Sequence, residues 1–425
     1  MISRREIKKV PVTVLTGFLG SGKTTLMNHI LQSPDHGMRF AIIENEFGQV
    51  GVDENILATP KENIDEEIIE VMNGCICCTV RGDLVEALKR IYKKVQSFDA
   101  VLIETTGLAD PAPVIQTFFV DEIIPELYSL DGVLTVVDAK HIIMRLDEEK
   151  PEGVENEANE QIAFADRVLL NKIDLVPDNA ELVKIEKRIK EVNNHCDIIR
   201  CQNSKVPMDK LLNLNGFNIE KILEKEPDFL KDADDAEHQH DERTTSVSCK
   251  LEGDLNVNKL ERWIGQLIKE KSADLYRYKG VLSVKGMPNK FVFQGVGMLF
   301  SGHFSDLHKW GPDEKRECSF VFIGKNLERD QLVKSFEECK AEEKLRFKVG
   351  DRVLAMTGEW MAGRIIKLWD EGNPYRIELE GGKGKGNKKM KGVNVWGPID
   401  EDTCVRAHPD SNPMTISNAS TVQGS

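Results

Sequence analysis

Short apolar runs alternate with stretches of helical periodicity along the first half of the chain. Residues 10–16, VPVTVLT, are β-branched and almost wholly apolar, which is typical of a strand buried on both faces of a parallel sheet. Further along, Leu84, Leu88 and Ile91 recur at the spacing of one helix face. This alternation predicts an α/β domain with a doubly wound parallel sheet. Its predicted strands are residues 10–16, 40–43, 68–72, 100–104, 130–138, 167–170 and 197–201.

The order of elements changes after a polar, acidic stretch at residues 231–243. We interpret this stretch as a disordered linker, and transient metal binding by His238 and His240 is the less favoured alternative. The elements that follow run in the order β-α-β-β-β-α, which predicts a compact α+β domain. They are strands at residues 245–251, 280–284, 290–296 and 318–324 and helices at residues 257–269 and 330–339.

Aromatic and branched residues lie among glycine and proline turns from residue 345 to residue 405. Trp360, Trp369 and Trp396 follow this pattern, which predicts a small SH3-like antiparallel β-barrel. Residues 344–397 hold 12 Lys and Arg against 6 Asp and Glu. This positive charge fits a docking module for a peptide, an acidic surface or nucleic acid, and it fits a solvated structural hairpin equally well.

Composition limits the classes of protein to which the chain can belong. The 425 residues are 40% hydrophobic, enough for two or three domains, and the net charge of −14 argues against nonspecific binding of nucleic acid or anionic membranes by the whole chain. No apolar run approaches the ~18 residues that a membrane span needs. Only about ten residues precede the first predicted strand, which is short for a signal peptide, so we expect a cytoplasmic protein. The composition is compatible with an oligomer.

The first predicted strand leads directly into a sequence of the form G-x-x-x-x-G-K-[ST], and a helical run follows it. Backbone N–H groups of such a loop face phosphate oxygens, Lys23 can neutralise the β- and γ-phosphates, and the Thr24 hydroxyl can ligate Mg²⁺. A chance glycine-rich turn is the weaker interpretation, because strand, loop and helix are in register. The predicted nucleotide-binding residues here are Gly17, Gly20, Ser21, Gly22, Lys23, Thr24 and Thr25.

Acidic residues end two further predicted strands, at the edge where open α/β sheets bind ligands. Glu44 and Glu46 suit Mg²⁺, an attacking water or a transition metal, and a solvated loop is the alternative. Glu104 can bind a water of the Mg²⁺ shell, and the N–H of Gly107 suits a γ-phosphate. For the base that activates water, Glu46 and Asp110 are candidates only. The predicted catalytic set is Lys23, Thr24, Glu46 and Glu104.

A third polar strand end consists of Asn171, Lys172 and Asp174. A carboxylate at this position can accept both the N1–H and the exocyclic amine of guanine, whereas adenine would leave it desolvated and unpaired. GTP is therefore favoured over ATP. The backbone near Ser204 is expected to complete the base pocket.

Three of the nine cysteines lie within the sequence NGCICC at residues 73–78. Thiolates suit Zn²⁺ or Cu(I), and Cys75, Cys77 and Cys78 could supply three ligands of a tetrahedral site whose fourth position stays open for exchange. A redox pair and buried packing thiols are the competing interpretations. We favour metal because the cluster lies between two segments expected to sense phosphate. The isolated cysteines, expected to be inert, are Cys196, Cys201, Cys249, Cys318, Cys339 and Cys404.

Together these motifs resemble the CobW-like family of metal-handling P-loop GTPases, which includes zinc chaperones and zinc-regulated GTPase metalloprotein activators. The resemblance implies slow GTP hydrolysis coupled to metal delivery, with GTP, Mg²⁺ and Zn²⁺ as cofactors, zinc on Cys75, Cys77 and Cys78, and a client metalloprotein as partner. Residues 1–10 lack the cysteine-proline-glutamate docking motif of the zinc chaperone that serves methionine aminopeptidase, so that client is not implied. The similarity covers about residues 10–340 and rests on residues 17–24, 44–48, 74–78, 104–107, 171–174, 277–280 and 293–296.

We therefore expect a GTP-dependent zinc metallochaperone. Two alternatives stay open: a GTPase that inserts cobalt or iron into a cofactor or enzyme, and a GTP-regulated redox-sensing adaptor that acts through the C-terminal module. The expected organisation is a P-loop GTPase domain at residues 1–225, an acidic linker at 226–243, a CobW-type C-terminal α+β domain at 244–341, a β-barrel-like module at 345–405 and a disordered tail at 406–425.

Overall fold

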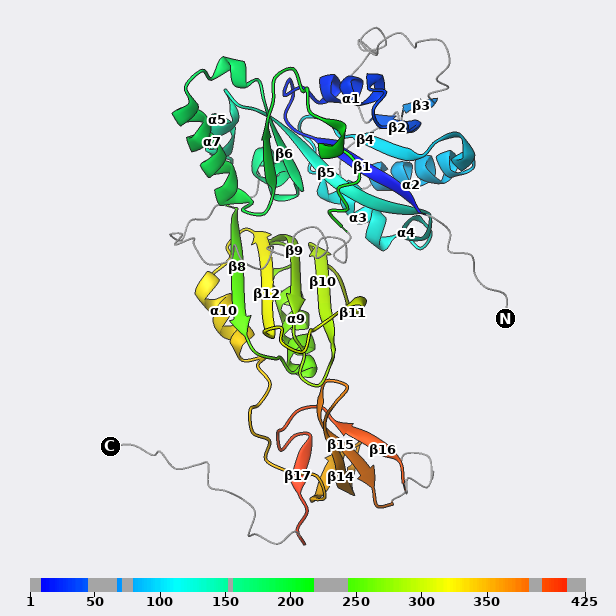
Figure 1. Cartoon of the computed structure of the whole chain (residues 1–425), viewed down its shortest axis with the longest axis vertical. Coiled ribbons are helices and arrows are strands. Elements are labelled where there is room, and N and C mark those ends of the chain that lie inside the picture. Colours follow the sequence, from blue (N-terminus) through cyan, green and yellow to red (C-terminus); the bar gives the residue numbers. More distant parts are fainter. Residues whose placement is uncertain are drawn as a thin grey trace.

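The computed structural model describes residues 9–44, 67–70, 79–151, 156–217, 244–381 and 392–410. Within these residues three sheets follow one another along the chain, and Figure 1 shows them stacked along the long axis of the molecule. The expected linker at residues 226–243 and most of the expected tail lie outside the described residues.

The first sheet is parallel throughout. Its strands are β1 (Val10–Thr16), β2 (Phe40–Glu44), β3 (Glu67–Glu70), β4 (Ala100–Glu104), β5 (Tyr128–Asp138), β6 (Arg167–Asn171) and β7 (Asp197–Arg200). They are arranged in the order β3-β2-β4-β1-β5-β6-β7. The ends of three neighbouring strands are in register, because Glu44 pairs with both Glu70 and Glu104. The last residues of these three strands therefore lie side by side at one edge of the sheet.

Helices cover both faces of this sheet (Figure 1). They are α1 (Lys23–Gln32), α2 (Thr79–Tyr92), α3 (Ala112–Val120), α4 (Ile124–Leu127), α5 (Ile142–Leu146), α6 (Glu157–Ala163) and α7 (Asn179–Val192). Local signals explain two of the helix starts, since the side chain of Asn156 accepts hydrogen bonds from backbone N–H groups at the start of α6 and Asp178 does the same for α7. The apolar strands are buried on both faces, so the predicted doubly wound parallel sheet is confirmed.

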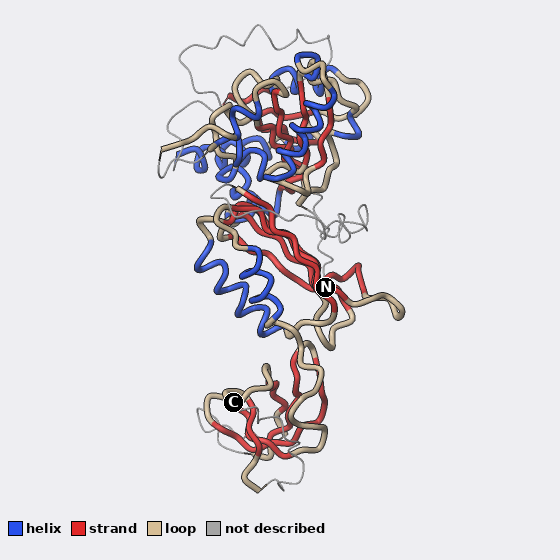
Figure 2. The backbone as a smooth tube through the Cα atoms, turned by 90° about the vertical axis from the view of Figure 1, so that its left-hand side faces the viewer, coloured by secondary structure: helices blue, strands red, loops and turns tan. Residues whose placement is uncertain are grey.

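The second domain combines an antiparallel sheet with two helices. Its elements are β8 (Thr245–Glu252), α9 (Val257–Lys271), β9 (Leu275–Leu282), β10 (Asn289–Val296), β11 (Leu299–Lys309), β12 (Glu317–Gly324) and α10 (Arg329–Glu337). The strand order is β11-β10-β9-β12-β8, and Figure 2 shows both helices on the same face. The predicted α+β architecture is confirmed. The strand predicted at residues 280–284 is instead β9, which begins at Leu275.

The third sheet is small, antiparallel and packed around its own core. Its strands are β13 (Arg352–Met356), β14 (Trp360–Asp370), β15 (Asn373–Leu379), β16 (Asn394–Gly397) and β17 (Val405–Ala407), in the order β16-β15-β14-β13-β17. Tyr375, Ile377 and Val405 are fully buried in that core. β17 continues past residue 405, which was the expected end of this module. Residues 382–391, which carry the lysine-rich stretch, lie outside the described residues.

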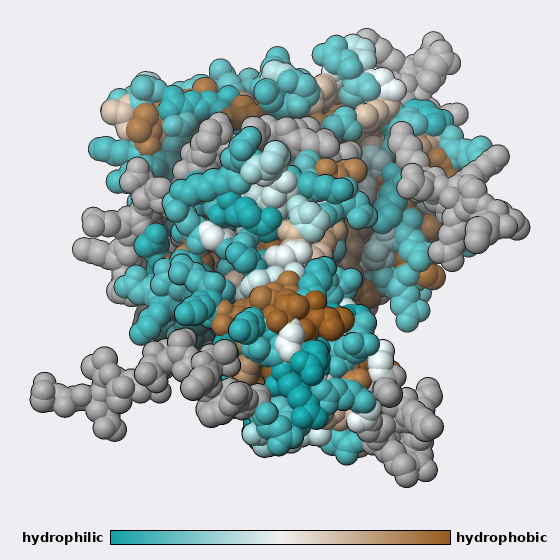
Figure 3. Space-filling model, turned by 60° about the horizontal axis from the view of Figure 1, so that its bottom comes forward, coloured by the Kyte–Doolittle hydropathy of each residue, from teal (hydrophilic) through white to brown (hydrophobic). Residues whose placement is uncertain are grey.

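In the space-filling view of Figure 3, which brings the lower end of the molecule forward, the surface is largely hydrophilic and hydrophobic side chains gather near the middle of the face. Exposed hydrophobic side chains of the third module include those of Val349, Met356 and Trp396. Two of its tryptophans lie under arginines, since the guanidinium of Arg376 is 4.2 Å from the ring centroid of Trp396 and that of Arg406 is 4.1 Å from the ring centroid of Trp360. Among the described residues of the whole chain, none of the helices has the length and apolarity that crossing a bilayer requires.

Candidate nucleotide and metal site

The phosphate loop connects β1 to α1 at the carboxyl edge of the parallel sheet. Gly22, just before α1, has a φ of 111°, and an added Cβ would lie 2.5 Å from Asn171 Nδ2 and 2.7 Å from Ser204 Oγ. Gly17 has a φ of 137°, and an added Cβ there would lie 2.1 Å from the carbonyl oxygen of Val136. Both positions need glycine, because a side chain would be strained and would collide with fixed neighbours.

The remaining loop residues leave polar groups available around this turn. The hydroxyl oxygen of Ser21 is buried and has no hydrogen-bond partner among the described residues, although a buried hydroxyl is normally paired. Gly20 has a φ of 75° with open space beside its Cα, and Thr25 is exposed in the first turn of α1. These features fit a cradle for phosphate oxygens.

Lys23 and Thr24 connect the loop to the end of β4. The ammonium of Lys23 is buried and donates to the carbonyl oxygens of Gly17, at 2.8 Å, and Phe18, at 3.2 Å. Burial lowers the pKa of Lys23, and the carboxylate of Glu104 offsets part of that effect. Thr24 Oγ1 donates to Glu104 Oε1 over 3.3 Å. The hydroxyl and the carboxylate are oxygen donors of the kind that Mg²⁺ prefers, so the residues present fit that ion.

The loop after β4 lies against the phosphate loop. An added Cβ on Gly107 would approach the backbone nitrogen of Leu19 to 2.5 Å, so the two backbones are in close contact. Asp110, a candidate base, accepts a hydrogen bond from the backbone N–H of Ala112 over 2.8 Å at the start of α3. The other candidate, Glu46, lies outside the described residues.

Gln161 of α6 contacts this loop and was not identified from the sequence. Its Nε2 donates to the carbonyl oxygens of Gly107, at 3.2 Å, and Ala109, at 3.3 Å. The side chain is 2% exposed. A glutamine within a helical pattern carries no local signal for such a contact, because its partners lie more than fifty residues earlier in the chain.

Asn171, at the end of β6, connects the residues that are expected to bind the nucleotide base. Its Nδ2 donates to the carbonyl oxygen of Ser21 over 2.9 Å and to Ser204 Oγ over 3.0 Å, while its Oδ1 accepts the backbone N–H of Ser204 over 2.9 Å. Ser204 Oγ donates in turn to the carbonyl oxygen of Gly22 over 2.9 Å. Asn171 therefore joins the phosphate loop to the Ser204 loop, and the two segments predicted from separate motifs meet here.

Lys172 and Asp174 lie beside this junction. Lys172 has a φ of 59°, and its ammonium donates to Asp138 Oδ2 at the end of β5 over 2.9 Å. Burial would raise the pKa of Asp138, but hydrogen bonds from Lys172 and His141 lower it below its ordinary value. Asp174 is exposed in a short 3₁₀ turn (Ile173–Leu175). Its carboxylate is open to a ligand from solvent.

The predicted metal ligands Cys75, Cys77 and Cys78 lie outside the described residues, as do His238 and His240. Within the part of the chain that the structure describes, no group of three or more His, Cys, Asp and Glu side chains could hold a metal ion.

The other six cysteines are free thiols, and all of them except Cys404 are buried. Burial raises the pKa of the thiols of Cys201 and Cys249 to about 11, and those of Cys196, Cys318 and Cys339 to about 12. A thiol with so high a pKa is a poor nucleophile at neutral pH.

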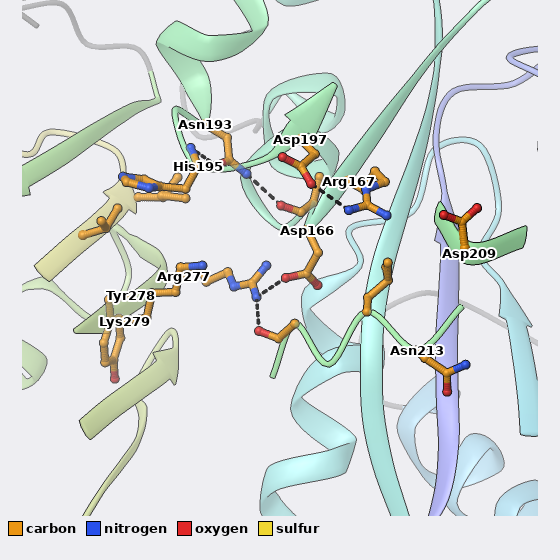
Figure 4. A pocket seen from close by; sticks show the side chains of 15 residues that line it. Asp166, Arg167, Asn193, His195, Asp197, Asp209, Asn213, Arg277, Tyr278 and Lys279 are labelled. Atoms are coloured by element: carbon orange, nitrogen blue, oxygen red, sulfur yellow. Dashed lines mark hydrogen bonds and ion pairs between the residues drawn. The ribbon is translucent and has the colours of Figure 1, made fainter. Parts of the chain in front are cut away.

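A cavity of about 130 Å³ lies at the junction of the first and second domains and is lined by residues of both (Figure 4). Arg277 of β9 lies beside it and donates to the carbonyl oxygens of Phe164, at 3.1 Å, and Gly216, at 3.0 Å, and to the carboxylate of Asp166. Its guanidinium also lies 4.2 Å from the ring centroid of Phe217. Asp166 precedes β6, so this junction is at the opposite edge of the sheet from the phosphate loop.

This geometry is that of a P-loop nucleotide-binding domain joined to an α+β domain. Residues 11–200 match the family described as CobW/HypB/UreG, nucleotide-binding domain, and residues 244–340 match the cobalamin synthesis protein cobW C-terminal domain. The chain belongs to the CobW family of P-loop GTPases, which confirms the resemblance found in its motifs. The third sheet lies beyond both matched regions.

Named relatives and a solved structure cover most of the chain. The zinc chaperone YjiA of Escherichia coli is 36% identical over an alignment of 332 residues that covers 77% of this chain and 98% of the relative. Zinc-regulated GTPase metalloprotein activator 1 of Saccharomyces cerevisiae is 29% identical over an alignment of 367 residues that covers 77% of this chain and 82% of the relative. The crystal structure of Zn(II)-bound YjiA GTPase superposes with a TM-score of 0.60 at 31% identity, covering 79% of this chain and 100% of that one.

Proposed function

We propose that the protein is a GTP-hydrolysing metallochaperone that binds zinc through its Cys-x-Cys-Cys motif at residues 75–78 and delivers it to a client metalloprotein. The observation that carries the proposal is the register of β3, β2 and β4, whose last residues Glu70, Glu44 and Glu104 lie side by side. The cysteine motif follows Glu70 closely in the sequence, and Glu104 contacts Thr24 of the phosphate loop. The proposed zinc motif and the proposed nucleotide site are therefore connected to neighbouring strands of the same sheet.

The nucleotide that best suits these residues is GTP. The glycines of the phosphate loop allow its backbone N–H groups to approach phosphate oxygens, and the Lys23 ammonium supplies a nearby positive charge. Asp174 would accept the two N–H groups on the edge of guanine, while Asn171 and Ser204 hold the pocket in shape. Thr24 and Glu104 would hold Mg²⁺, which as a Lewis acid neutralises charge that develops on phosphoryl oxygens.

Zinc is the metal that we favour, because thiolates are soft ligands and because the relatives described above are named for zinc. Three cysteines leave one tetrahedral position open, which suits a metal that must be handed on. If the γ-phosphate changes the affinity for zinc, zinc must change the affinity for GTP by the same factor. Cobalt or iron insertion is the alternative with the same ligands.

An adaptor that acts through the third module is the alternative from another class. Deleting residues 345–425 separates the two, and the relatives support the design because 77% of this chain already covers 98% of YjiA. We expect the truncated protein to keep its GTPase rate within about twofold and to retain zinc after desalting in the presence of a GTP analogue. The measurement is zinc per chain by atomic absorption, with the full-length protein alongside.

The deletion result is decisive in either direction. If the truncated protein still hydrolyses GTP but no longer retains zinc, the third module is part of the metal function, and the proposal that residues 75–78 suffice to hold zinc is wrong. Nucleotide binding by the truncated protein serves as the control for folding.

A further inference from the structure

The C-terminal turn of helix α6 contacts both the loop after β4 and the second domain. The side-chain Nε2 of Gln161 donates to the loop carbonyls of Gly107 and Ala109. The carbonyl oxygen of Phe164, the residue that follows α6, accepts a hydrogen bond from Arg277 of β9 over 3.1 Å. Gln161 and Phe164 are one helical turn apart.

Both ends of this connection are rigid. Gln161 is 2% exposed, and its own backbone carbonyl accepts a hydrogen bond from Thr135 Oγ1 over 2.8 Å, so that the residue is fixed to β5. Arg277 is 5% exposed, and its guanidinium also binds Asp166 and the carbonyl oxygen of Gly216. A helical turn held in this way couples the position of the loop after β4 to that of the second domain.

The contact with Gln161 restricts the loop after β4, which lies against the phosphate loop. Because each peptide unit is planar, fixing a carbonyl also fixes the N–H of the same unit. Gln161 holds the peptide units that follow Gly107 and Ala109, whose N–H groups are those of Leu108 and Asp110. The N–H of Gly107 belongs to the peptide unit immediately before the first of these, and Gly107 lies against the backbone of Leu19 in the phosphate loop. The conformation of the loop on both sides of Leu108 therefore depends on the buried side chain of Gln161.

We propose that Gln161 is a positioning residue for GTP hydrolysis, and that Arg277 anchors the helix that carries it to the C-terminal domain. The inference rests on the proposed contact of Gly107 with the γ-phosphate and makes no use of the metal site. Through these contacts, the position of the C-terminal domain affects the rate of GTP hydrolysis. If Gln161 only stabilised the fold, its replacement would weaken the binding of GTP and GDP equally.

The test replaces Gln161 with methionine, which keeps the length and the apolar stem of the side chain and removes both donors. We expect the single-turnover rate of GTP hydrolysis to fall about 10²-fold, the size of effect that follows from a misplaced reacting group. The affinity for GDP, which has no γ-phosphate, should stay within about twofold. The measurements are rapid-quench hydrolysis and calorimetric titration with GDP, without added zinc.

Gln266→Met is the matched control, because it makes the same change at an exposed glutamine of α9 whose Nε2 contacts Glu270 and no residue of the loop. We expect it to leave the hydrolysis rate within about threefold. A second variant, Arg277→Lys, keeps the positive charge beside Asp166 but lacks the planar fork that reaches several acceptors at once. It should slow hydrolysis with little change in the affinity for GDP.

An unchanged hydrolysis rate in Gln161→Met would overturn the proposal, and so would a parallel loss of GTP and GDP affinity. If Gln161→Met does not fold, Arg277→Lys decides, and an unchanged rate in that variant counts against the proposal. Because zinc is absent from the assay, a failure of the proposed metal function would not produce any of these results.

Discussion

Replacing Lys23 with alanine is expected to lower kcat/KM for GTP hydrolysis by about 10²- to 10³-fold, the effect of removing one preorganised electrostatic group from a phosphoryl-transfer site. The Lys23 ammonium is already fixed at the head of the loop by the carbonyl oxygens of Gly17 and Phe18. Burial lowers the pKa of Lys23 because it disfavours the charged form of the side chain. A bound phosphate would stabilise that charged form. Steady-state phosphate release measures the effect.

The fold should survive the change, because the ammonium is not part of the hydrophobic core. Circular dichroism on heating checks this expectation. The matched control is Lys184→Ala, which removes an exposed lysine from α7 and should leave both rate and stability unchanged. A Lys23→Ala protein that hydrolyses GTP at the normal rate would mean that the nucleotide does not bind at this loop.

Replacing Arg277 with alanine is expected to destabilise the two-domain unit by about 3–5 kcal/mol, the range for breaking a buried ion pair from one side. The Arg277 and Asp166 side chains are only 6% and 10% exposed. Loss of the guanidinium would leave the Asp166 carboxylate buried near that of Asp131, whose pKa is raised by burial and also by Asp166. The buried Asp166 carboxylate would then lose the guanidinium that neutralises it.

Scanning calorimetry should show the transition of the two domains lowered by roughly 10 °C, given the usual relation between stability and melting temperature at this size. The double variant Arg277→Ala with Asp166→Asn should recover part of the loss, because the stranded charge is gone. Arg188, whose partner Asp147 is 43% exposed, supplies the control. Arg188→Ala should cost no more than about 1 kcal/mol. A similar small loss for Arg277→Ala would show that the interface does not depend on this pair.

The sequence was sufficient to predict those parts of the candidate site whose residues are neighbours in the chain. The strand, loop and helix around residues 17–24 are set by local signals, and so are the polar ends of β4 and β6. The buried strands were recognisable because a strand covered on both faces is apolar at every position. β11 was not assigned from its sequence, since this edge strand is exposed at most positions and lacks an apolar alternation.

The contacts that connect the motifs could not be predicted from the sequence, because they depend on tertiary packing. Asn171 was expected to act at the base pocket, yet its amide also bonds to the phosphate loop 150 residues earlier. Gln161 and Arg277 look like ordinary polar residues of a helix and a strand. Their importance comes from carbonyl groups and a carboxylate that reach them from distant parts of the chain.

The proposed GTP-dependent delivery of zinc requires that the γ-phosphate of the nucleotide change the affinity for zinc. The most direct test is a competition titration of Zn²⁺ against a chromophoric chelator, with the protein held in a GTP analogue or in GDP under thiol-preserving conditions. We predict tighter zinc binding with the GTP analogue, by a factor within the usual range of about 5–150. Cys77→Ser should abolish this difference and leave GTP binding largely intact. Equal zinc affinities in the two nucleotide states would contradict the account.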